Sequence, residues 1–542
     1  MKINRLLFYI IFITFSTGNI LMTSCSGSDS DVTDGTDTSV DPSENTSDET
    51  TTDTDSSEEV VESQRIYIST QEDFDEYKNH EFSAGDTILF KSGASFVGQF
   101  SPKGSGTTNY PIVVAAYDSE TNEPLFEDID DKPIINGQGL PDVDDDDELG
   151  TFYLYNEDNW IISNLEITNT DGTDDDQGKL CGILIRAKDI GTAENFTVRY
   201  CYIHDVNGEV ADKYRGGIEF KVSGSTQSTI FDNVLIEYNV VSYVGGIGIE
   251  NKTSWGKLDE DDYYPWTNYI IRGNRVDHTG KNGIIVRNCI SPIIEYNILN
   301  RTSMYDTGNS MFNCNTKYAV MQYNEVYGNT GDIDDHERGG FDADNISENT
   351  TIQYNYSHGN HWFCAMMCKE NYGITIRYNV SVNDLVAVYN YGFPNKNKIS
   401  DVLIYNNTSY FKSGINATIF SNKGDTERTP KETKIYNNIF YFEDPTTWAV
   451  TPNSTCELSH NLFYNIPEIG SDNITSDPMF VNKGDCPSDI DMTSNSRLSS
   501  YQLDDGSPCI DSGKTIEDNG GIDFAGNLLS DSKTDIGAFE KQ

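Results

Sequence analysis

The chain has 542 residues and carries 87 Asp or Glu against 37 Lys or Arg, which gives a formal net charge of −50. This negative field repels nucleic acid and anionic membrane surfaces, so neither is expected as a partner. The length alone predicts more than one domain, but one internal repeat accounts for nearly all of it.

Residues 1–25 have the pattern of an export signal. Lys2 and Arg5 precede an apolar run, Leu6–Phe15, that is too short to span a bilayer. The end of the segment, Leu-Met-Thr-Ser-Cys, resembles the lipobox of bacterial lipoproteins, with Met22 at a position usually held by Leu. This resemblance implies cleavage before Cys25 and attachment of lipid to Cys25. An ordinary signal peptide that is cut elsewhere is the alternative.

Residues 26–64 are predicted to be a disordered acidic tether. The segment contains thirteen Asp or Glu and no Lys or Arg, and its remaining residues are largely Ser and Thr. Such a composition cannot bury a hydrophobic core. Three acidic residues soon after Cys25 (Asp29, Asp31 and Asp34) resemble an export signal of some Gram-negative bacteria. The expected location is therefore the bacterial outer membrane, facing outside, with the lipid anchor as the only membrane contact.

A four-residue phrase, Ile-x-Tyr-Asn, recurs through the middle of the chain at intervals of 23 to 35 residues. An apolar phrase opened by Gly lies between many of the copies, as in GIEFK at Gly217 and GIIVR at Gly283. Hydrophobic residues alternate with a period of two, which is typical of strands. The copies of the phrase end at Asn239, Asn274, Asn297, Asn324, Asn355, Asn379, Asn407, Asn438 and Asn461.

A strand-only repeat of this length predicts a parallel β-helix, with roughly a dozen coils stacked about 4.8 Å apart. We expect it to span residues 65–497. The repeated Asn side chains are predicted to form a buried ladder, each amide bonding its neighbour, because a buried amide must be hydrogen-bonded. We place each Asn at a tight bend, since Asn tolerates left-handed backbone. A row of ligands is the alternative interpretation of the repeated Asn.

Two further segments resemble bacterial pectin-lyase-like β-helix proteins. GDTILFKSG (Gly85–Gly93) and KPIING (Lys132–Gly137) are similar to the first coils of secreted carbohydrate-active members. SPCIDSG (Ser507–Gly513) and DIGAFE (Asp535–Glu540) resemble the terminal cap of right-handed β-helix repeat proteins. The resemblance implies an all-β, right-handed, single-stranded parallel β-helix with a cap at residues 498–542. It leaves the activity open, because this fold carries lyases, hydrolases, epimerases and adhesins.

Charged residues recur near the Gly-opened phrases. Counting four residues on from the opening Gly aligns Lys221, Glu250, Arg287 and Asp344, and counting two on gives Glu219 and Asp342. Residues i and i+2 of a strand share a face, and ionised groups cannot lie unpaired in a core. We therefore predict one outward row of charges: Glu219, Lys221, Glu250, Arg287, Asp342, Asp344 and Lys369. A solvated sheet face of mixed charges is the alternative.

Two loops flank this row. The long corner at 329–339 brings His336 and Arg338 next to the Gly-opened strand, and His361 follows in a segment rich in Asp and His. The insertion Lys252–Asn268 carries Trp255 and Trp266, whose rings could stack on sugars. Packing of these rings over the sheet edge is the alternative.

Three functions fit this pattern, all with a polysaccharide or oligosaccharide as partner. A glycoside hydrolase needs two carboxylates, about 5–5.5 Å apart for retention or about 6.5–9.5 Å for inversion. A polysaccharide lyase needs a Lys, Arg or His base, although the acidic surface argues against an anionic polymer. A glycan-binding or adhesive protein needs only the aromatic loop.

The hydrolase is the favoured function, with the pairs Asp342–Asp344 and Asp344–Glu250 as its candidates. Its predicted catalytic residues are Asp342, Asp344, Glu250 and His336. Its predicted substrate-binding residues are Arg287, Arg338, Lys369, His361, Lys221, Glu219, Trp255 and Trp266.

No cofactor is expected to be required, with Ca²⁺ as a candidate ligand of three acidic runs (142–148, 171–176 and 259–262) that lack EF-hand spacing. Cysteines beyond Cys25 show no zinc spacing, and most are expected in the core. Cys486 and Cys509 are a candidate disulfide. A monomer is the expected state.

Overall fold

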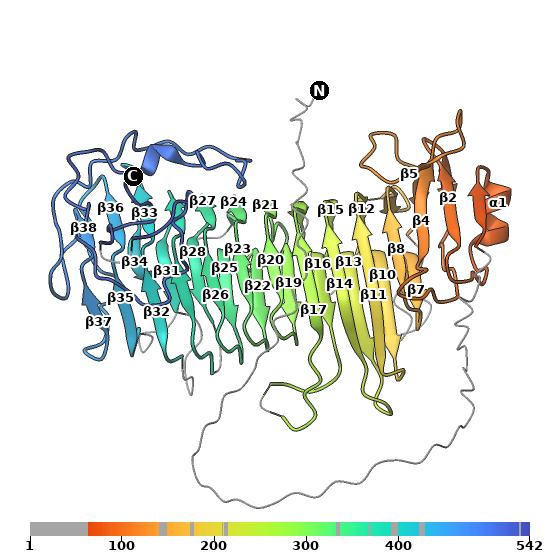
Figure 1. Cartoon of the computed structure of the whole chain (residues 1–542), viewed down its shortest axis with the longest axis horizontal. Helices are drawn as coiled ribbons and strands as arrows, with labels where there is room; N and C mark the ends of the chain where they lie inside the picture. The colour runs from red at the N-terminus through yellow and green to blue at the C-terminus, as the bar shows by residue number, and fades with distance from the viewer. Residues whose placement is uncertain are drawn as a thin grey trace, which may run out of the picture. The chain divides into compact units, whose positions relative to one another are not determined.

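The computed structural model describes residues 63–139, 149–173, 178–208, 210, 215–258, 260–331, 337–367, 370–391, 399–421, 429–530 and 533–542. These residues form a parallel β-helix, as predicted, in which three long sheets run side by side along the stack (Figure 1). A short helix, α1 (Gln71–Tyr77), stands at the first coils and buries Phe74. No helix in the described ranges is long and apolar enough to cross a membrane.

From β7 (Leu149–Tyr155) to β36 (Ile439–Phe442) each coil passes through the three sheets in turn, whereas the described residues of the first and last coils form no strand of the second sheet. Among the described strands, all pairs but one are parallel. Sheet 1 has the spatial order β1 (Arg65–Ile68), β2 (Thr87–Lys91), β4 (Ile112–Tyr117), β8 (Trp160–Ser163), β11 (Thr192–Arg199), β14 (Ile230–Glu237), β17 (Thr267–Arg272), β20 (Ile293–Glu295), β23 (Val320–Gln322), β26 (Thr351–Gln353), β29 (Thr375–Arg377), β32 (Val402–Tyr405), β35 (Thr433–Tyr436) and β37 (Glu457–Ser459), with β5 (Pro124–Leu125) antiparallel to β4.

Sheet 2 comprises β7 (Leu149–Tyr155), β10 (Leu180–Lys188), β13 (Gly216–Ser223), β16 (Ile247–Lys252), β19 (Ile284–Arg287), β22 (Met311–Cys314), β25 (Gly339–Asp344), β28 (Trp362–Met366), β31 (Ala387–Tyr391) and β34 (Thr418–Ser421). Sheet 3 comprises β3 (Ser95–Val97), β6 (Ile134–Asn136), β9 (Glu166–Asn169), β12 (Tyr202–Val206), β15 (Val240–Val244), β18 (Arg275–Thr279), β21 (Ile298–Asn300), β24 (Glu325–Tyr327), β27 (Tyr356–His358), β30 (Val380–Val382), β33 (Thr408–Phe411), β36 (Ile439–Phe442) and β38 (Leu462–Tyr464).

The interior of the stack is filled by the alternate, inward residues of the three sheets. In one coil these are Ile218 and Phe220 from β13, Ile236 from β14 and Val241 from β15, all of them buried. Because successive side chains of a strand point to opposite faces, the residues between them face outward. The outer face of each sheet is therefore where polar chemistry can lie.

The predicted asparagine ladder is confirmed at the corner between sheets 1 and 3. The side chain of Asn297 accepts from the backbone N–H of Asn274 at 2.9 Å and donates to Asn324 Oδ1 at 3.0 Å and to the carbonyl of Ile271 at 3.1 Å. The same pattern links the amides in an unbroken series from Asn239 to Asn461. The ladder is structural, because these amides are buried and bonded to one another.

The predicted reason for the Asn was wrong, because the left-handed residue is the one before it. Tyr296, Tyr323 and Tyr354 have φ values of 57°, 54° and 56°. Their rings lie outside the coil and stack on one another, with centroids 4.9 and 5.1 Å apart. In the Ile-x-Tyr-Asn phrase, Ile and Asn therefore point inward while Tyr makes the bend.

We expect Asn297→Ala to destabilise the protein by about 1–3 kcal/mol for each buried group that it leaves without a partner. The substitution removes bonds to Asn274, Asn324 and Ile271 together. Denaturant unfolding measures the loss, and Asn109→Ala in an exposed turn is the control. Equal stability of the two variants would show that the ladder contributes nothing.

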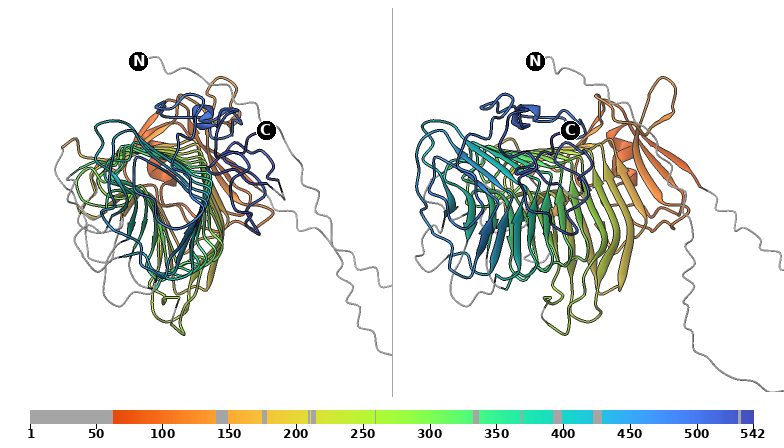
Figure 2. Two further views of the ribbon diagram at one scale, coloured as in Figure 1. Left: turned by 90° about the vertical axis from the view of Figure 1, so that its left-hand side faces the viewer. Right: turned by 60° about the vertical axis from the view of Figure 1, so that its left-hand side comes forward.

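The C-terminal segment folds back along the outside of sheet 3 as a cap (Figure 2). Glu325 of β24 accepts from the backbone N–H groups of Asp489 and Ile490 at 2.8 and 2.7 Å. Further along, the side chain of Asn406 donates to the carbonyls of Asp535 and Gly537. A 3₁₀ turn, η1 (Ser499–Tyr501), lies in this cap.

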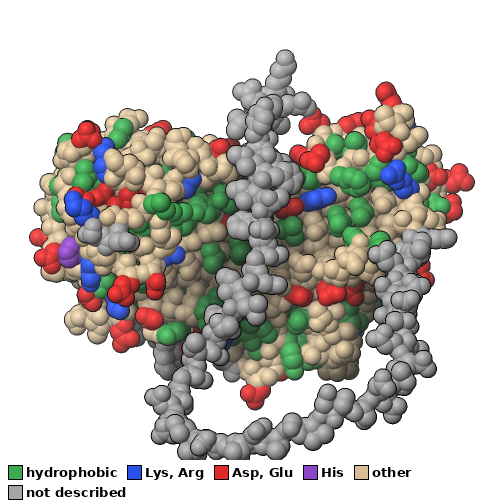
Figure 3. Space-filling view, viewed as in Figure 1, with side chains coloured by type: hydrophobic (Ala, Val, Ile, Leu, Met, Phe, Trp, Pro, Cys, Tyr) green, Lys and Arg blue, Asp and Glu red, His purple; other side chains and the backbone are tan. Residues whose placement is uncertain are grey.

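The candidate disulfide of the cap is not formed: both described thiols are free, Cys509 in the core of the cap and Cys486 exposed. Acidic side chains are spread over the face shown in Figure 3, including both ends of the stack, in agreement with the composition.

Candidate functional site

The outer face of sheet 2 carries two rows of residues, each in register from coil to coil. The first row is Leu184, Glu219, Glu250, Ile285, Phe312, Asp342 and Ala365. Two residues further along the strands, the second row contains Arg186, Lys221 and Lys252, and then Arg287, Cys314 and Asp344. The predicted single row is therefore wrong, because the charges divide into two.

The error in the predicted register arises at β16. Counting from Gly246 placed Glu250 level with Lys221, but Ile218 pairs with Ile249, so Gly248 is the counterpart of Gly217. Glu250 therefore lies beside Glu219, and Lys252 lies beside Lys221. Lys252 was missed for the same reason, although counting from Gly248 would have found it.

The carboxylates of the first row face outward and are nonetheless buried. Glu219, Glu250 and Asp342 are 0%, 1% and 2% exposed. A solvated sheet face, the simpler interpretation of these charges, is thus wrong for these three. A buried carboxylate is costly unless it is paired and hydrogen-bonded, so the partners decide what each can do.

Glu250 is held by the guanidinium of Arg287. Its Oε2 accepts from Arg287 Nη1 at 2.6 Å, and Nη1 also donates to the carbonyl of Asn251 at 2.8 Å. Glu250 Oε1 has no hydrogen-bond partner among the described residues. Burial raises the pKa of Glu250; Arg287 opposes the shift and the neighbouring Glu219 adds to it.

Glu219 and Lys252 complete this cluster of charges. The thiol of Cys181 donates to Glu219 Oε2 at 3.4 Å. Burial lowers the pKa of Lys252, while the carboxylates of Glu219 and Glu250 act against that shift. Two adjacent acids and their neighbouring bases therefore lie together on successive coils.

Asp342 and Asp344 form a second acidic group on β25. Asn309 Nδ2 donates to Asp342 Oδ2 at 2.8 Å, and Asn309 Oδ1 accepts from the backbone N–H of Gly339 at 2.7 Å. Asp344 is partly exposed and accepts from the backbone N–H of Asn345 at 2.8 Å. The amide of Asn309 thus fixes the Asp342 carboxylate from the coil before it.

The two acidic groups are too far apart to act on one bond. Ile285 and Phe312 separate Glu250 from Asp342 in the first row. Three strand spacings amount to about 14 Å between the backbones, beyond the range for a glycosidase pair. The predicted pairing of Asp344 with Glu250 is therefore wrong. The pairs Asp342–Asp344 and Glu219–Glu250 remain.

The aromatic insertion does not present both predicted rings to solvent. Trp266 is fully buried in the hydrophobic core, where its ring contacts Phe231 and Tyr269. Its assignment to substrate binding is wrong, because the insertion ends at this residue and the next strand begins. Trp255 is partly exposed and meets the ring of Tyr264 edge-on at 5.7 Å, so it stays a candidate.

The remaining predicted contacts are buried or lie beyond the described residues. Arg338 is buried and its Nη1 donates to the carbonyls of Ser303 at 2.7 Å and Thr330 at 3.3 Å, so it joins two loops instead of facing a substrate. His361 is also buried, with its ring edge-on to Trp362. Three assigned residues lie outside the described ranges: His336, Lys369 and Cys25.

In the described part of the chain, no group of three His, Cys, Asp or Glu could hold a metal ion. The acidic run at 142–148 and parts of the other two lie outside the described residues. Asp171, which is described, caps its own turn by accepting from the backbone N–H and hydroxyl of Thr173.

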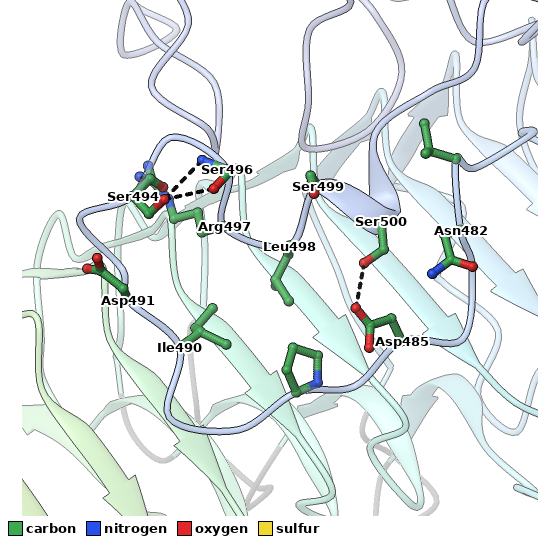
Figure 4. A pocket seen from close by; sticks show the side chains of 12 residues that line it. Asn482, Asp485, Ile490, Asp491, Ser494, Ser496, Arg497, Leu498, Ser499 and Ser500 are labelled. Carbon is green, nitrogen blue, oxygen red and sulfur yellow. Dashed lines mark hydrogen bonds between the residues drawn. The ribbon is translucent and has the colours of Figure 1, made fainter. Parts of the chain in front are cut away.

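A pocket of about 470 Å³ lies in the cap, away from sheet 2 (Figure 4). Four of its polar side chains bond one another: Ser494 with Ser496, and Ser500 with Asp485. The guanidinium of Arg497 lies over the ring of Tyr323. We therefore do not place the glycosidase chemistry here.

The chain matches no known family model. It is 26% identical to a lacto-N-biosidase of Bifidobacterium longum subsp. longum over an alignment of 569 positions, which covers 85% of this chain and 34% of that protein. The chain thus spans about a third of the length of the curated relative that it matches.

Two crystal structures of a GH136 lacto-N-biosidase from Eubacterium ramulus are similar in fold. The selenomethionine derivative and the native protein give TM-scores of 0.53 and 0.52, with 20% and 19% sequence identity. Each comparison covers 67% of this chain and 66% of the other. At this level of identity the likeness supports the parallel β-helix and nothing further.

Proposed function

We propose that this protein hydrolyses a glycosidic bond of an oligosaccharide or polysaccharide, at the outer face of sheet 2. The observation that carries the proposal is the Asp342 carboxylate, which faces outward, is buried, and is fixed by Asn309 beside Asp344. The relative named lacto-N-biosidase, 26% identical over 85% of this chain, supports the same reaction class. A lacto-N-bioside is therefore the first substrate to test.

Asp342 and Asp344 are suited to complementary roles. Burial favours the uncharged form of a carboxyl group, which a general acid needs before it protonates the leaving oxygen. Asp344 is partly exposed, so a water molecule can reach it, and its carboxylate can act as the general base that takes a proton from that water. The backbones of residues i and i+2 of a strand lie about 6.6 Å apart, a spacing from which two carboxyl groups on one face can reach the separation for inversion. Glu219 and Glu250, about 4.8 Å apart on adjacent strands, are closer to the range for retention.

The test is incubation of the full chain with p-nitrophenyl lacto-N-bioside and a panel of host, plant and algal polysaccharides. Hydrolysis gives new reducing ends without ultraviolet absorbance from unsaturated sugars, and NMR spectra of the first product give the anomer. Inversion agrees with the Asp342–Asp344 pair. A retained anomer excludes that pair, and binding without any product leaves only the glycan-binding function.

One observation favours a lyase as the second candidate. The second row places Arg186, Lys221 and Lys252 on successive coils, in a chain that is otherwise strongly acidic. Such a row would attract the carboxylates of a uronic acid polymer, and the lowered pKa of Lys252, which burial causes, brings it closer to acting as a base. Unsaturated products that disappear in Lys252→Met would establish this function.

We also propose that the protein is a lipoprotein anchored through Cys25, which the sequence motif supports. Cys25→Ala is expected to move the protein from the membrane fraction to the soluble fraction, because lipid attached to Cys25 is the only anchor that we propose. Cell fractionation measures this, with Thr46→Ala in the tether as the control. Membrane retention of Cys25→Ala would contradict the assignment.

A further inference from the structure

A Glu–His–Cys chain lies where the cap meets sheet 3, apart from the carboxylates of sheet 2. Glu325 on β24 is fully buried. Its Oε1 lies 3.0 Å from Nε2 of His358, which is on β27, the neighbouring strand of sheet 3. Both carboxylate oxygens also accept backbone N–H groups, from Asp489 and Ile490. The carboxylate is therefore fixed in place, and it orients the imidazole.

The thiol of Cys486 completes the chain. Its Sγ accepts from the hydroxyl of Tyr356 at 3.6 Å. It is also near enough to His358 for each of the two groups to shift the pKa of the other. The rings of Tyr356 and Tyr327 stack on the imidazole, with centroids 4.5 and 4.6 Å away. The imidazole is thus fixed by a buried carboxylate and two stacked rings, next to the thiol of Cys486, and a neighbouring His is the group that activates a cysteine nucleophile.

The charges of the three groups support one another. Burial lowers the pKa of His358, but its bonds to Cys486 and Glu325 outweigh this and raise it to about 9. Burial raises the pKa of Cys486, but His358, Tyr356 and Asn383 together hold it below the usual value. Further ionisable groups lie near this Glu–His–Cys chain. Tyr327 and Arg275 both bond to Asp489, Arg275 at 2.8 Å. Tyr501 interacts with Cys486, and Asp384 interacts with His358. By contrast, burial raises the pKa of Cys201 to about 11 and that of Cys509 to about 12.

Cys486 is also accessible. The residue is exposed, and its chain neighbours Asp485 and Pro487 line the cap pocket of about 470 Å³. Figure 4 shows this segment along the rim of the pocket. The pocket therefore offers room for a small disulfide next to the two chain neighbours of Cys486.

We propose that Cys486 is a reactive thiolate and a site of covalent modification by low-molecular-weight disulfides. The thiolate attacks one sulfur of R–S–S–R, so that a Cys486–S–S–R bond forms and the original S–S bond breaks. The second half leaves as the thiolate RS⁻, reduced, while Cys486 is oxidised. His358 keeps its proton and stabilises the attacking thiolate. This site is independent of the proposed glycosidase reaction.

The test uses the full chain and Ellman's reagent, an aromatic disulfide whose leaving thiolate is coloured. We expect one fast-reacting thiol, which is absent in Cys486→Ser. The pH dependence of its reaction rate should have a midpoint below the ordinary thiol pKa of about 8.5. His358→Gln should slow the reaction at neutral pH by about tenfold, because the thiolate loses its cation. His204→Gln is the matched control: His204 lies on β12, its ring is 3.0 Å from the carboxylate of Glu166 on β9, and its other hydrogen-bond partner among the described residues is Asp205 and not a cysteine.

Two results would overturn the proposal: a pH–rate profile of the wild-type protein with its midpoint at the ordinary thiol pKa, or a Cys486 that reacts no faster than the other thiols. So would a His358→Gln variant that folds and reacts as fast as wild type. If that variant does not fold, the pH–rate profile of the wild-type protein still decides.

The same contacts give the sign of a pH effect on stability. The contribution of His358, whose pKa is raised to about 9, is present below its unfolded pKa of about 6.5 and is lost as pH rises through about 9. The contribution of Cys486, whose pKa is lowered, is present above the ordinary thiol pKa and is lost as pH falls through its folded value. Modification of Cys486 removes its charge, so it should lower the melting temperature between the folded pKa of Cys486 and about pH 9, where the thiolate and the His358 cation are both present.

Discussion

Asp342→Asn is expected to lower turnover by about 10²-fold or more, the scale of lost acid–base catalysis. Asn has nearly the same shape, and its side-chain oxygen can still accept from Asn309 Nδ2, so the fold should be retained. Initial rates on the substrate identified by the panel measure the loss, and thermal unfolding checks stability. Asp75→Asn on α1, exposed and far along the chain from sheet 2, is the matched control.

Other carboxylates decide what an unexpected result would mean. If Asp342→Asn cleaves normally while Glu219→Gln or Glu250→Gln does not, the catalytic pair is the one on β13 and β16. If all these variants cleave normally, the acidic groups take no part in the reaction. If Trp255→Ala then loses glycan binding and no variant of the carboxylates changes cleavage, the protein is better explained as a glycan-binding protein.

Arg287→Met is expected to destabilise the protein by about 3–5 kcal/mol, because it leaves the Glu250 carboxylate buried without its cation. The pair is well enclosed: the side chains of Arg287 and Glu250 are 15% and 1% exposed. Urea unfolding of wild type and variant at neutral pH measures the difference. Protonation of Glu250 in the variant would reduce the loss, so the loss should grow as pH rises.

The double variant Arg287→Met/Glu250→Met distinguishes a structural role of this ion pair from a role in the reaction. Replacing a buried ion pair by apolar side chains is often neutral or stabilising, and Ile285 gives Glu250 an apolar neighbour on the next strand. Most of the stability should therefore return. A double variant that is stable and active assigns Glu250 a structural role, whereas one that is stable and inactive assigns it to catalysis. A double variant as unstable as Arg287→Met would contradict the pairing.

The fold could be predicted because the repeated phrase records a contact that every coil makes. An inward Asn at one place in each coil can bond only to its neighbours, and the structure confirms that ladder. The left-handed backbone at Tyr296 and its equivalents could not be inferred from residue type, because Tyr rarely adopts it. The stacking of the rings across coils is a tertiary effect.

The site was predicted less well because it depends on register and burial. A choice between Gly246 and Gly248 moved Glu250 by two residues and hid Lys252, and a sequence with several glycines does not settle that choice. Outward direction was inferred correctly for Glu219 and Asp342, but outward residues can still be buried. The prediction that Trp266 binds substrate was wrong because a ring at the end of a polar loop can pack into the core.

The stacked tyrosines make the stack cooperative in one dimension. A left-handed Tyr costs roughly 1–2 kcal/mol within its own coil, and an aromatic contact returns about 0.5–1.5 kcal/mol only when the neighbouring ring is in place. A single coil is therefore unstable alone, and growth from a nucleus of several coils is favoured. Unfolding should begin at an end and proceed coil by coil, as in a nearest-neighbour chain. Removing a whole inner coil, ladder Asn and Tyr together, should shorten the rod while preserving its pattern of contacts.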